Sequence, residues 1–326
     1  MNQRFRWTPV AAALLALPAC ETDAPPVEVR VPQGATLSDV VDSLANREIV
    51  RAPGLFELYA RMRGAGSDIR AGAYALRPHS SWNRVIGTLT RGEVLTVPMT
   101  VPEGFRLSQI APRIANISGI HVDSVMAHLE RPELVDDLDV PGPTLEGYLF
   151  PDTYRFTPGT SVSTVVRTMA EHYHALWTPE RREQLEATGM TEREIVTLAS
   201  IIQAEARQVD EMPLISGVYH RRLDQGWLLQ ADPTVLYALG GRRERLLYAA
   251  IDSVENNPYN TYTQPGLPPG PIGAPGERAV DAALAPEGDF LYFVARPDGS
   301  HVFTRSLAEH NRAKAESQRL RDARDP

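Results

Sequence analysis

Hydrophobic residues recur every three or four positions in several stretches of the chain, which is the spacing of one face of an α-helix. In the first two stretches they are Leu37, Val40, Val41 and Leu44, and then Trp82, Val85, Ile86 and Leu89. Each stretch follows a short segment, at 27–31 and at 71–76, whose pattern is typical of a β-strand. Residues 27–97 therefore predict a small α/β subdomain.

Beyond residue 97 the pattern changes to helices separated by longer loops. A strand at 95–101 and a helix containing Leu107, Ile110 and Ala111 open this second part. Further helices are predicted near 120–131, 162–177, 191–207 and 214–225. We place a domain boundary near Val97 and expect an α+β fold, in which a mixed α+β domain over 98–326 ends in a polar helix.

The helix predicted from Thr191 carries the main catalytic candidate. Thr191 and Glu194 form a capping-box pattern at its start. Near its end, Glu205 follows Leu198 and Ile202 on the apolar stripe, so its carboxyl group is expected to be half turned into the core. Burial disfavours the charged form and raises the pKa, as a general acid requires. The alternative is a buried structural glutamate that is satisfied by an arginine or a backbone amide.

Two polar motifs follow this helix. In Gln230-Ala-Asp-Pro-Thr234, Asp232 before Pro233 predicts a helix N-cap with proline at the first helical position, which leaves Gln230 and Thr234 at an element boundary where ligands commonly bind. In the second motif, Tyr259, Asn260 and Tyr262 precede a loop rich in glycine and proline. Their side chains could stack on and hydrogen-bond to sugars, or could be ordinary turn residues.

The N-terminus has the layout of a secretory signal. Arg4 and Arg6 precede an apolar run at 10–17, which is too short to cross a bilayer as a helix, and Cys20 follows directly. The segment Leu17-Pro-Ala-Cys20 resembles the lipobox of bacterial lipoproteins, although Pro18 departs from that pattern. We therefore expect a membrane anchor over 1–20, either a lipid on Cys20 or a short uncleaved helix, and a linker over 21–26.

Composition narrows the possible functions further. The 33 basic and 41 acidic residues give a net charge of −8, which offers no electrostatic surface for nucleic acid. A single cysteine excludes an intrachain disulfide and a multi-cysteine metal site.

Seven motifs together resemble those of the MltG (YceG-like) endolytic transglycosylases, in order and spacing, over essentially the whole chain after the signal. They are Pro102-Glu-Gly104, the segment 145–154 with Glu146 and Tyr148, Leu198-Ala-Ser-Ile-Ile-Gln-Ala-Glu205, Gln230-Ala-Asp-Pro-Thr234, Tyr259-Asn-Thr-Tyr262, Gly266-Leu-Pro-Pro-Gly270 and Leu291-Tyr-Phe-Val294. The resemblance implies that 27–97 is a LysM-like subdomain and that 98–326 is the catalytic domain.

The resemblance also implies a reaction. Glu205 corresponds to the catalytic glutamate of this family, and Gln203 stands where many members carry a second glutamate. The enzyme would cleave the β-1,4 bond between N-acetylmuramic acid and N-acetylglucosamine in peptidoglycan strands and leave 1,6-anhydro ends. It would need no cofactor or metal. Glu146, Tyr148, Gln230, Asp232, Thr234, Tyr259, Asn260 and Tyr262 are the candidate substrate-binding residues.

Two alternatives stay open at this point. One is a muramidase-type hydrolase that pairs Glu205 with Asp232, and the other is a membrane-tethered module that binds peptidoglycan without cleaving it. In each case we expect the chain to be anchored at the inner membrane with its domains in the periplasm, where peptidoglycan synthases are candidate partners.

Overall fold

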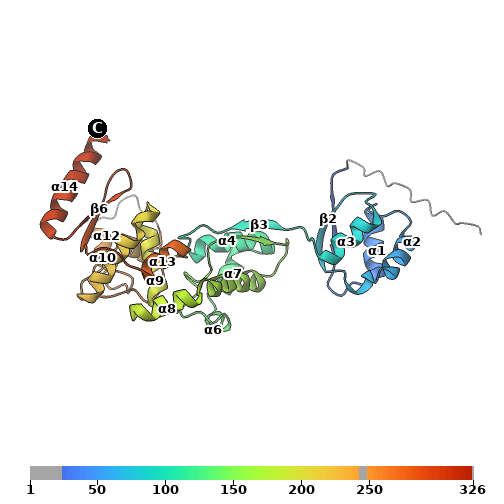
Figure 1. Cartoon of the computed structure of the whole chain (residues 1–326), viewed down its shortest axis with the longest axis horizontal. Helices are drawn as coiled ribbons and strands as arrows, with labels where there is room; N and C mark the ends of the chain where they lie inside the picture. Colours follow the sequence, from blue (N-terminus) through green and yellow to red (C-terminus); the bar gives the residue numbers. More distant parts are fainter. Residues whose placement is uncertain (1–23, 242–247, 325–326) are drawn as a thin grey trace, which may run out of the picture. The chain divides into compact units, whose positions relative to one another are not determined.

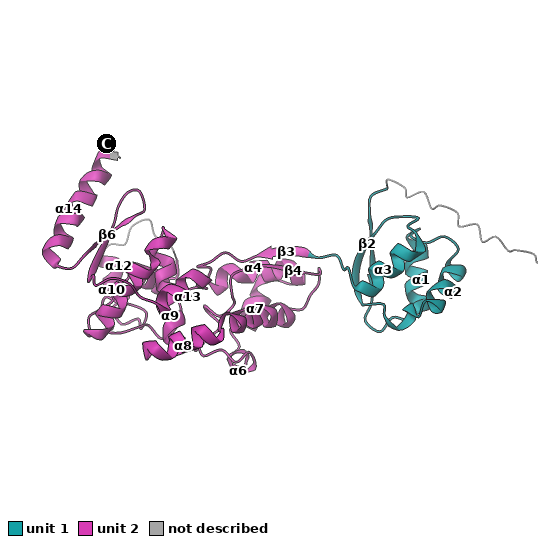
Figure 2. Ribbon diagram, viewed as in Figure 1, with its two compact units in different colours: residues 1–96 teal, residues 97–326 magenta. Residues whose placement is uncertain are grey.

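The computed structural model describes residues 24–241 and 248–324, which divide into two compact units on either side of the boundary between residues 96 and 97 (Figure 2). The predicted anchor at 1–20, including Cys20, lies outside the described residues. Within the described ranges, no helix combines the length and the apolar character that a membrane span requires.

Unit 1 is built on two antiparallel strands covered by helices (Figure 1). Its elements are β1 (Val27–Val31), α1 (Leu37–Asn46), α2 (Pro53–Met62), the 3-10 turn η1 (Ala65–Ser67), β2 (Gly72–Leu76) and α3 (Trp82–Arg91). Thr36 caps α1, and Gly92 ends α3 in the left-handed conformation. The apolar stripes predicted for α1 and α3 meet β1 and β2 in a separate core, which contains Val40, Leu44, Tyr74, Val85 and Leu89. The helix α2 was not predicted.

Unit 2 is mainly helical, with two short antiparallel strand pairs. Its first half contains β3 (Val97–Thr100), α4 (Leu107–Ser118), α5 (Val122–Leu129), α6 (Glu133–Asp137), β4 (Thr153–Phe156), α7 (Val162–Leu176) and α8 (Pro179–Thr188). Its second half contains α9 (Glu192–Glu205), η2 (Val209–Glu211), α10 (Met212–Asp224), α11 (Asp232–Ala238), α12 (Tyr248–Asp252), α13 (Glu277–Leu284), β5 (Tyr292–Ala295), β6 (His301–Thr304) and α14 (Leu307–Arg324). The predicted α+β fold is confirmed.

The helix α9 runs through the core of unit 2. It packs against α10, α11 and α13, and every residue from 195 to 202 is buried. The predicted capping box fixes its start, because the Thr191 hydroxyl accepts a hydrogen bond from the Glu194 amide at 3.3 Å and the Glu194 carboxylate accepts one from the Thr191 amide at 2.8 Å. Glu205 is the last residue of this helix, so a rigid element holds it.

The loop rich in glycine and proline is fastened to α9 by two polar side chains. The Ser200 hydroxyl accepts a hydrogen bond from the Ile272 amide at 3.0 Å, and the Gln203 side-chain oxygen accepts one from the Gly276 amide at 3.0 Å. Buried backbone amides need such partners. Gln203 therefore has a structural role beside Glu205.

Candidate active site

Glu205 lines a cavity of about 700 Å³ formed between the end of α9 and the C-terminal elements. Side chains from α10, α11, α12, the β5–β6 hairpin and α14 complete its wall. The other lining residues are Arg222, Gln230, Asp232, Tyr248, Ile251, Tyr262, Phe293, Val294, Ala295, His301, His310 and Lys314. The cavity therefore combines acidic, basic and aromatic groups, as a site for a polar ligand requires.

The carboxyl group of Glu205 is half-buried and has one hydrogen-bond donor, the Tyr219 hydroxyl, at 3.1 Å from Oε1. Burial, and after it the negative charge of Asp232, raise the pKa of Glu205 to about 7. The hydrogen bond from Tyr219 and the charge of Arg222 act in the opposite direction. Glu205 is therefore able to hold and release a proton near neutral pH.

Asp232 faces the same cavity from the start of α11. Its carboxylate is exposed and accepts a hydrogen bond from the Tyr262 hydroxyl at 2.5 Å. The prediction that Asp232 is the helix N-cap is wrong, because the N-cap is Ala231 and no side chain caps this helix. The Thr261 hydroxyl accepts a hydrogen bond from the Ala231 amide at 3.0 Å, which fixes the entry to α11 one residue earlier and frees the Asp232 carboxylate for Tyr262.

The other residues of these two motifs divide between the cavity and the core. Gln230 is exposed at the cavity, and its backbone φ of +50° is uncommon for a residue other than glycine. Thr234 and Asn260 are fully buried. Thr234 binds the Thr261 hydroxyl at 2.8 Å, and the Asn260 amide donates to the carbonyl oxygen of Ile251 at 3.0 Å. In this structure Thr234 and Asn260 shape the site, so the prediction that they contact substrate is not supported.

The predicted substrate contacts Glu146, Tyr148 and Tyr259 line none of the cavities around Glu205. Tyr148 is fully buried with its ring against Tyr173 at 5.2 Å, which leaves it no surface for a sugar. Glu146 is also buried and accepts a hydrogen bond from the Leu107 amide at 3.0 Å. Burial places Glu146 and Tyr148 in the core, which argues against direct contact with a sugar, whereas Tyr259 is half-buried and its contact with substrate stays a prediction.

Glu146 is a second carboxyl group with a perturbed pKa. Burial raises it to about 7, against the hydrogen bond from Leu107 and the charge of Arg106. The Tyr237 hydroxyl lies 3.4 Å from its other oxygen, and the Tyr237 ring packs on Tyr259 at 4.7 Å between centroids. Since this cluster is separate from the cavity, Glu146 is suited to hold elements together rather than to transfer protons to a substrate.

Several residues in and around the site were not predicted, and two pairs of them illustrate why. Tyr219 and Arg222 lie three residues apart on α10, so they share one face of the helix, and both reach the surroundings of Glu205. Arg222 falls on the buried face of this helix, and an arginine at such a position is the signal that could have identified it. The ring Nδ1 of His301 lies 2.7 Å from the carboxylate of Glu211, 90 positions earlier in the chain, and no local pattern indicates such a pair.

The cavity at Glu205 continues into neighbouring hollows. A second cavity, of about 370 Å³, shares Glu205, Asp232, Ala295 and His301 with the first. A third, of about 470 Å³, shares Ala204, Pro233 and Leu236 with the second. Glu205 therefore lies along an extended groove rather than at a closed end.

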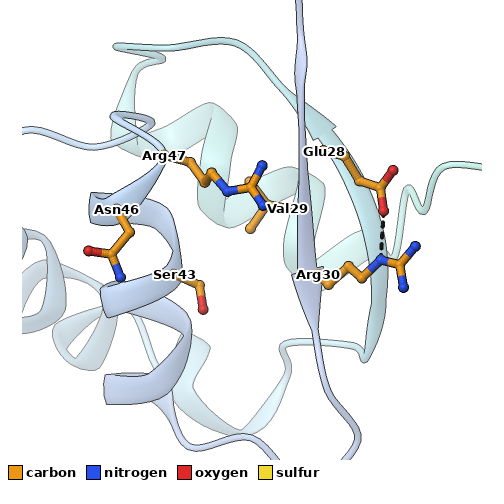
Figure 3. Close-up of a pocket in the computed structure, with 6 residues that line it drawn as sticks. All are labelled: Glu28, Val29, Arg30, Ser43, Asn46 and Arg47. Carbon is orange, nitrogen blue, oxygen red and sulfur yellow. Dashed lines mark hydrogen bonds and ion pairs between the residues drawn. The ribbon is translucent and has the colours of Figure 1, made fainter.

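Unit 1 has a cavity of its own, of about 510 Å³, between β1 and α1 (Figure 3). Its lining includes the ion pair of Arg30 with Glu28, at 2.7 Å, together with Ser43, Asn46 and Arg47. The groups suited to proton transfer lie in unit 2, so the candidate active site is the groove at Glu205. Among the residues described, no three histidine or acidic side chains gather in a way that could hold a metal ion.

Comparison with known proteins agrees with the motifs. The model of the YceG-like family matches residues 29–316. The endolytic murein transglycosylase of Bacillus subtilis is 33% identical over 305 residues, covering 88% of this chain and 84% of that protein. The protein of the same name from Streptococcus pneumoniae strain D39 is 28% identical, and the match covers 89% of this chain but only 58% of that longer protein.

A solved structure is also similar. The crystal structure of a putative YceG-like protein from Listeria monocytogenes superimposes with a TM-score of 0.61 at 30% sequence identity, and the match covers 88% of this chain and 98% of that one. The family resemblance inferred from the seven motifs is confirmed, and the match extends through both units.

Proposed function

Because the chain belongs to the YceG-like family, we propose that it is an endolytic murein transglycosylase in which Glu205 is the catalytic acid and base. The names of the relatives from B. subtilis and S. pneumoniae support the class of enzyme. The observation that carries the residue assignment is the environment of Glu205. Its pKa is raised to about 7 at the surface of a groove, on the end of a rigid helix.

The proposed reaction needs one carboxyl group. Protonated Glu205 donates its proton to the oxygen that links N-acetylmuramic acid to N-acetylglucosamine, and the bond from that oxygen to the muramic acid C1 breaks. The Glu205 carboxylate then accepts the proton of the muramic acid C6 hydroxyl as its oxygen bonds to C1. The products are a 1,6-anhydro end and a free 4-hydroxyl group, without water.

The neighbouring groups suit this cycle. The Tyr219 hydroxyl donates to Glu205 and fixes its orientation. Asp232 favours the protonated form that begins the reaction, and its negative charge would also stabilise positive charge on the sugar in the transition state. The hollows on either side of Glu205 support cleavage within a strand, because a glycan chain needs room in both directions.

A muramidase-type hydrolase is the second candidate, and the shared cavity of Glu205 and Asp232 favours it. In that reaction Asp232 would act as nucleophile or would activate a water molecule, so two carboxyl groups would be essential. The two reactions leave different ends on the glycan. Hydrolysis adds a water molecule, whereas the transglycosylase reaction does not.

The test is mass spectrometry of glycan strands digested in water enriched in ¹⁸O. We expect 1,6-anhydro ends without ¹⁸O from the wild type and no cleavage by Glu205→Gln, because the amide has a similar shape but cannot donate an acidic proton. Glu146→Gln is the matched control, since Glu146 also has a pKa of about 7 but lies outside the groove. Reducing ends that carry ¹⁸O would support the hydrolase, and cleavage by folded Glu205→Gln would exclude Glu205 as the acid.

We also propose that the enzyme acts at the periplasmic face of the inner membrane. The support is the N-terminal signal pattern that ends at Cys20. Tethering there would bring the groove close to newly made strands and to the synthases that make them.

A further inference from the structure

Of the basic residues that line the cavity at Glu205, His301 is paired with Glu211, and three others remain. Arg222 comes from α10, and His310 and Lys314 come from α14, which packs against β5 and β6. Lys314 is the only lysine in a chain that has 33 basic residues and a net charge of −8. Basic side chains therefore gather on this wall although the whole chain is acidic.

Arg222 is held in a fixed position and is only 9% exposed. Its Nε donates to the carbonyl oxygen of Leu291 at 3.0 Å, and its Nη1 donates to that of Leu229 at 2.6 Å. Its guanidinium carbon lies 5.8 Å from the centre of the Tyr292 ring. Within the described ranges Arg222 forms no ion pair, although the carboxyl groups of Glu205 and Asp232 line the same cavity. A buried cation whose hydrogen bonds go to neutral carbonyls is stabilised further by an anion that joins it.

His310 lies close to the other two basic groups. Its ring stacks on Tyr292 with centroids 5.2 Å apart. Burial lowers its pKa, and the charges of Lys314 and Arg222 lower it further, which agrees with their closeness. Its Nδ1 is buried, and no described residue forms a hydrogen bond with it. A buried nitrogen without a partner is uncommon, and His310 is one of the residues that line the cavity.

Lys314 lies one helical turn beyond His310, on the same face of α14. Its side chain is exposed, lines the cavity and has no acidic partner among the residues that the structure describes. A flexible exposed ammonium group beside a fixed guanidinium group is suited to bind a mobile anionic group.

We propose that Arg222, His310 and Lys314 form a subsite for a carboxylate of the peptide that is attached to the muramic acid next to the cleaved bond. This inference rests on the function proposed above. A carboxylate would accept hydrogen bonds from guanidinium N–H groups that Leu291 and Leu229 do not occupy, and it would neutralise the buried charge. A carboxylate on the attached peptide is favoured over one further along the strand, because the subsite and Glu205 share one cavity.

The test measures binding of glycan strands to full-length Glu205→Gln, which leaves the strands intact. Two ligands are compared: strands with their natural peptides, and the same strands after their carboxyl groups have been converted to amides. We expect the amidated strands to bind more weakly by about tenfold or more, because an ion pair with a nearly buried arginine is lost. Added salt should reduce the difference, mainly through the exposed Lys314.

Lys314→Gln in the same background should weaken binding of the acidic strands by about two- to five-fold, as expected for one exposed ion pair, and leave the amidated strands unaffected. Arg319→Gln is the matched control, since Arg319 is exposed on the same helix and lines none of these cavities. Arg222→Gln should have a larger effect, and its melting temperature is measured in parallel. If Arg222→Gln is unstable, the conclusion rests on the binding measured for Lys314→Gln.

Equal binding of acidic and amidated strands would overturn the subsite, as would equal effects of Lys314→Gln and Arg319→Gln. Those outcomes are distinct from failure of the proposed function. If the reaction itself is wrong, the wild type produces no anhydro ends, whatever the affinity of the strands.

Discussion

Glu205 and Asp232 place two carboxyl groups in one cavity, but the surroundings of the two groups differ. Glu205 is half-buried at a helix end, and burial raises its pKa to about 7. Asp232 is exposed and is held by a short hydrogen bond from Tyr262. The charge of Asp232 and the hydroxyl of Tyr219 act on Glu205 in opposite directions, so their removal should change its titration with opposite signs.

We predict opposite shifts in the pH profile for Asp232→Asn and Tyr219→Phe. Activity requires protonated Glu205, so it falls as pH rises through the pKa of Glu205. Asp232→Asn removes a negative charge and lowers this pKa, which moves the alkaline limb to lower pH. Tyr219→Phe removes a donor to the carboxylate and raises the pKa, which moves the limb to higher pH. The measurement is kcat/KM for strand cleavage from pH 5 to 9.

Melting temperatures of both variants provide the control for this comparison. Tyr219→Phe should lose about 1 kcal/mol of stability, as for one hydrogen bond. Shifts of the same sign in both variants would mean that the alkaline limb reports a group other than Glu205. Complete loss of turnover in folded Asp232→Asn would favour the hydrolase.

The sequence motifs predicted which segments form the site but not which side chains face it. Gln230, Asp232 and Tyr262 line the groove, whereas Thr234 and Asn260 of the same motifs are buried. A motif can be needed for the shape of a turn as much as for contact with a ligand. Only the three-dimensional packing separates these roles, and only it brings Tyr219 and Arg222 to Glu205.

At the scale of elements, a helix was predictable where it buries a clear stripe of apolar residues and has a capping residue at its start. The helix α9 has both, and its start was predicted at the correct residue. The helix α8 was missed because it is polar on most sides and buries only Leu185. The strand β4 was missed because its four residues are too few for an alternating pattern to stand out. Its pairing with β3 spans about 50 residues of intervening chain.

Glu146 joins two elements that lie far apart in the sequence. It accepts from the amide at the start of α4 and is approached by Tyr237 of α11, the helix that carries Asp232. Its pKa in the folded protein is about 7, above its ordinary value of 4.5. The folded protein therefore binds more protons than the unfolded chain between these values. The free energy of unfolding therefore falls as pH rises through this window. This loss of stability is complete above about pH 7.

We predict that the difference in free energy of unfolding between Glu146→Gln and the wild type depends on pH and is larger at pH 8 than at pH 4.5. Glutamine keeps an acceptor for the Leu107 amide but cannot ionise. It should be close to the wild type at pH 4.5 and more stable than the wild type at pH 8, by up to roughly 3 kcal/mol from linkage. The measurement is the free energy of unfolding in urea at both pH values.

Glu146→Ala is the companion variant, since it leaves the buried Leu107 amide without its partner. It should lose about 1–3 kcal/mol even at pH 4.5, where the wild-type carboxyl group is largely protonated. If the difference between Glu146→Gln and the wild type is the same at both pH values, Glu146 does not titrate in this window.

At the scale of the whole molecule, attachment to the membrane depends on the N-terminal signal. We predict that Cys20→Ala releases the protein from the membrane fraction, because the apolar run at 10–17 is shorter than a spanning helix requires. Stable attachment is expected to require the several acyl chains of a mature lipoprotein. The measurement is the distribution between membranes and soluble periplasm after fractionation. Retention of Cys20→Ala in membranes would indicate an uncleaved apolar anchor instead.

The last prediction concerns the division into two units. The core of unit 1 contains only residues from 29 to 89, and that of unit 2 contains only residues from 99 to 284. Glu205 and the residues that line its groove all belong to unit 2. A fragment that begins at Val97 is therefore expected to fold and to keep the complete groove.

We predict that this fragment loses more activity on long glycan strands than on short oligosaccharides. The polar cavity of unit 1 offers hydrogen-bonding groups for a second, weak contact with a long strand. Two weak sites on one chain raise the effective concentration of such a strand, whereas a short oligosaccharide reaches only one site and gains nothing. The measurement is kcat/KM of full chain and fragment on both substrates, with melting temperatures in parallel. An equal fractional loss on both substrates, or a large fall in melting temperature, would mean that unit 1 serves only to support the fold.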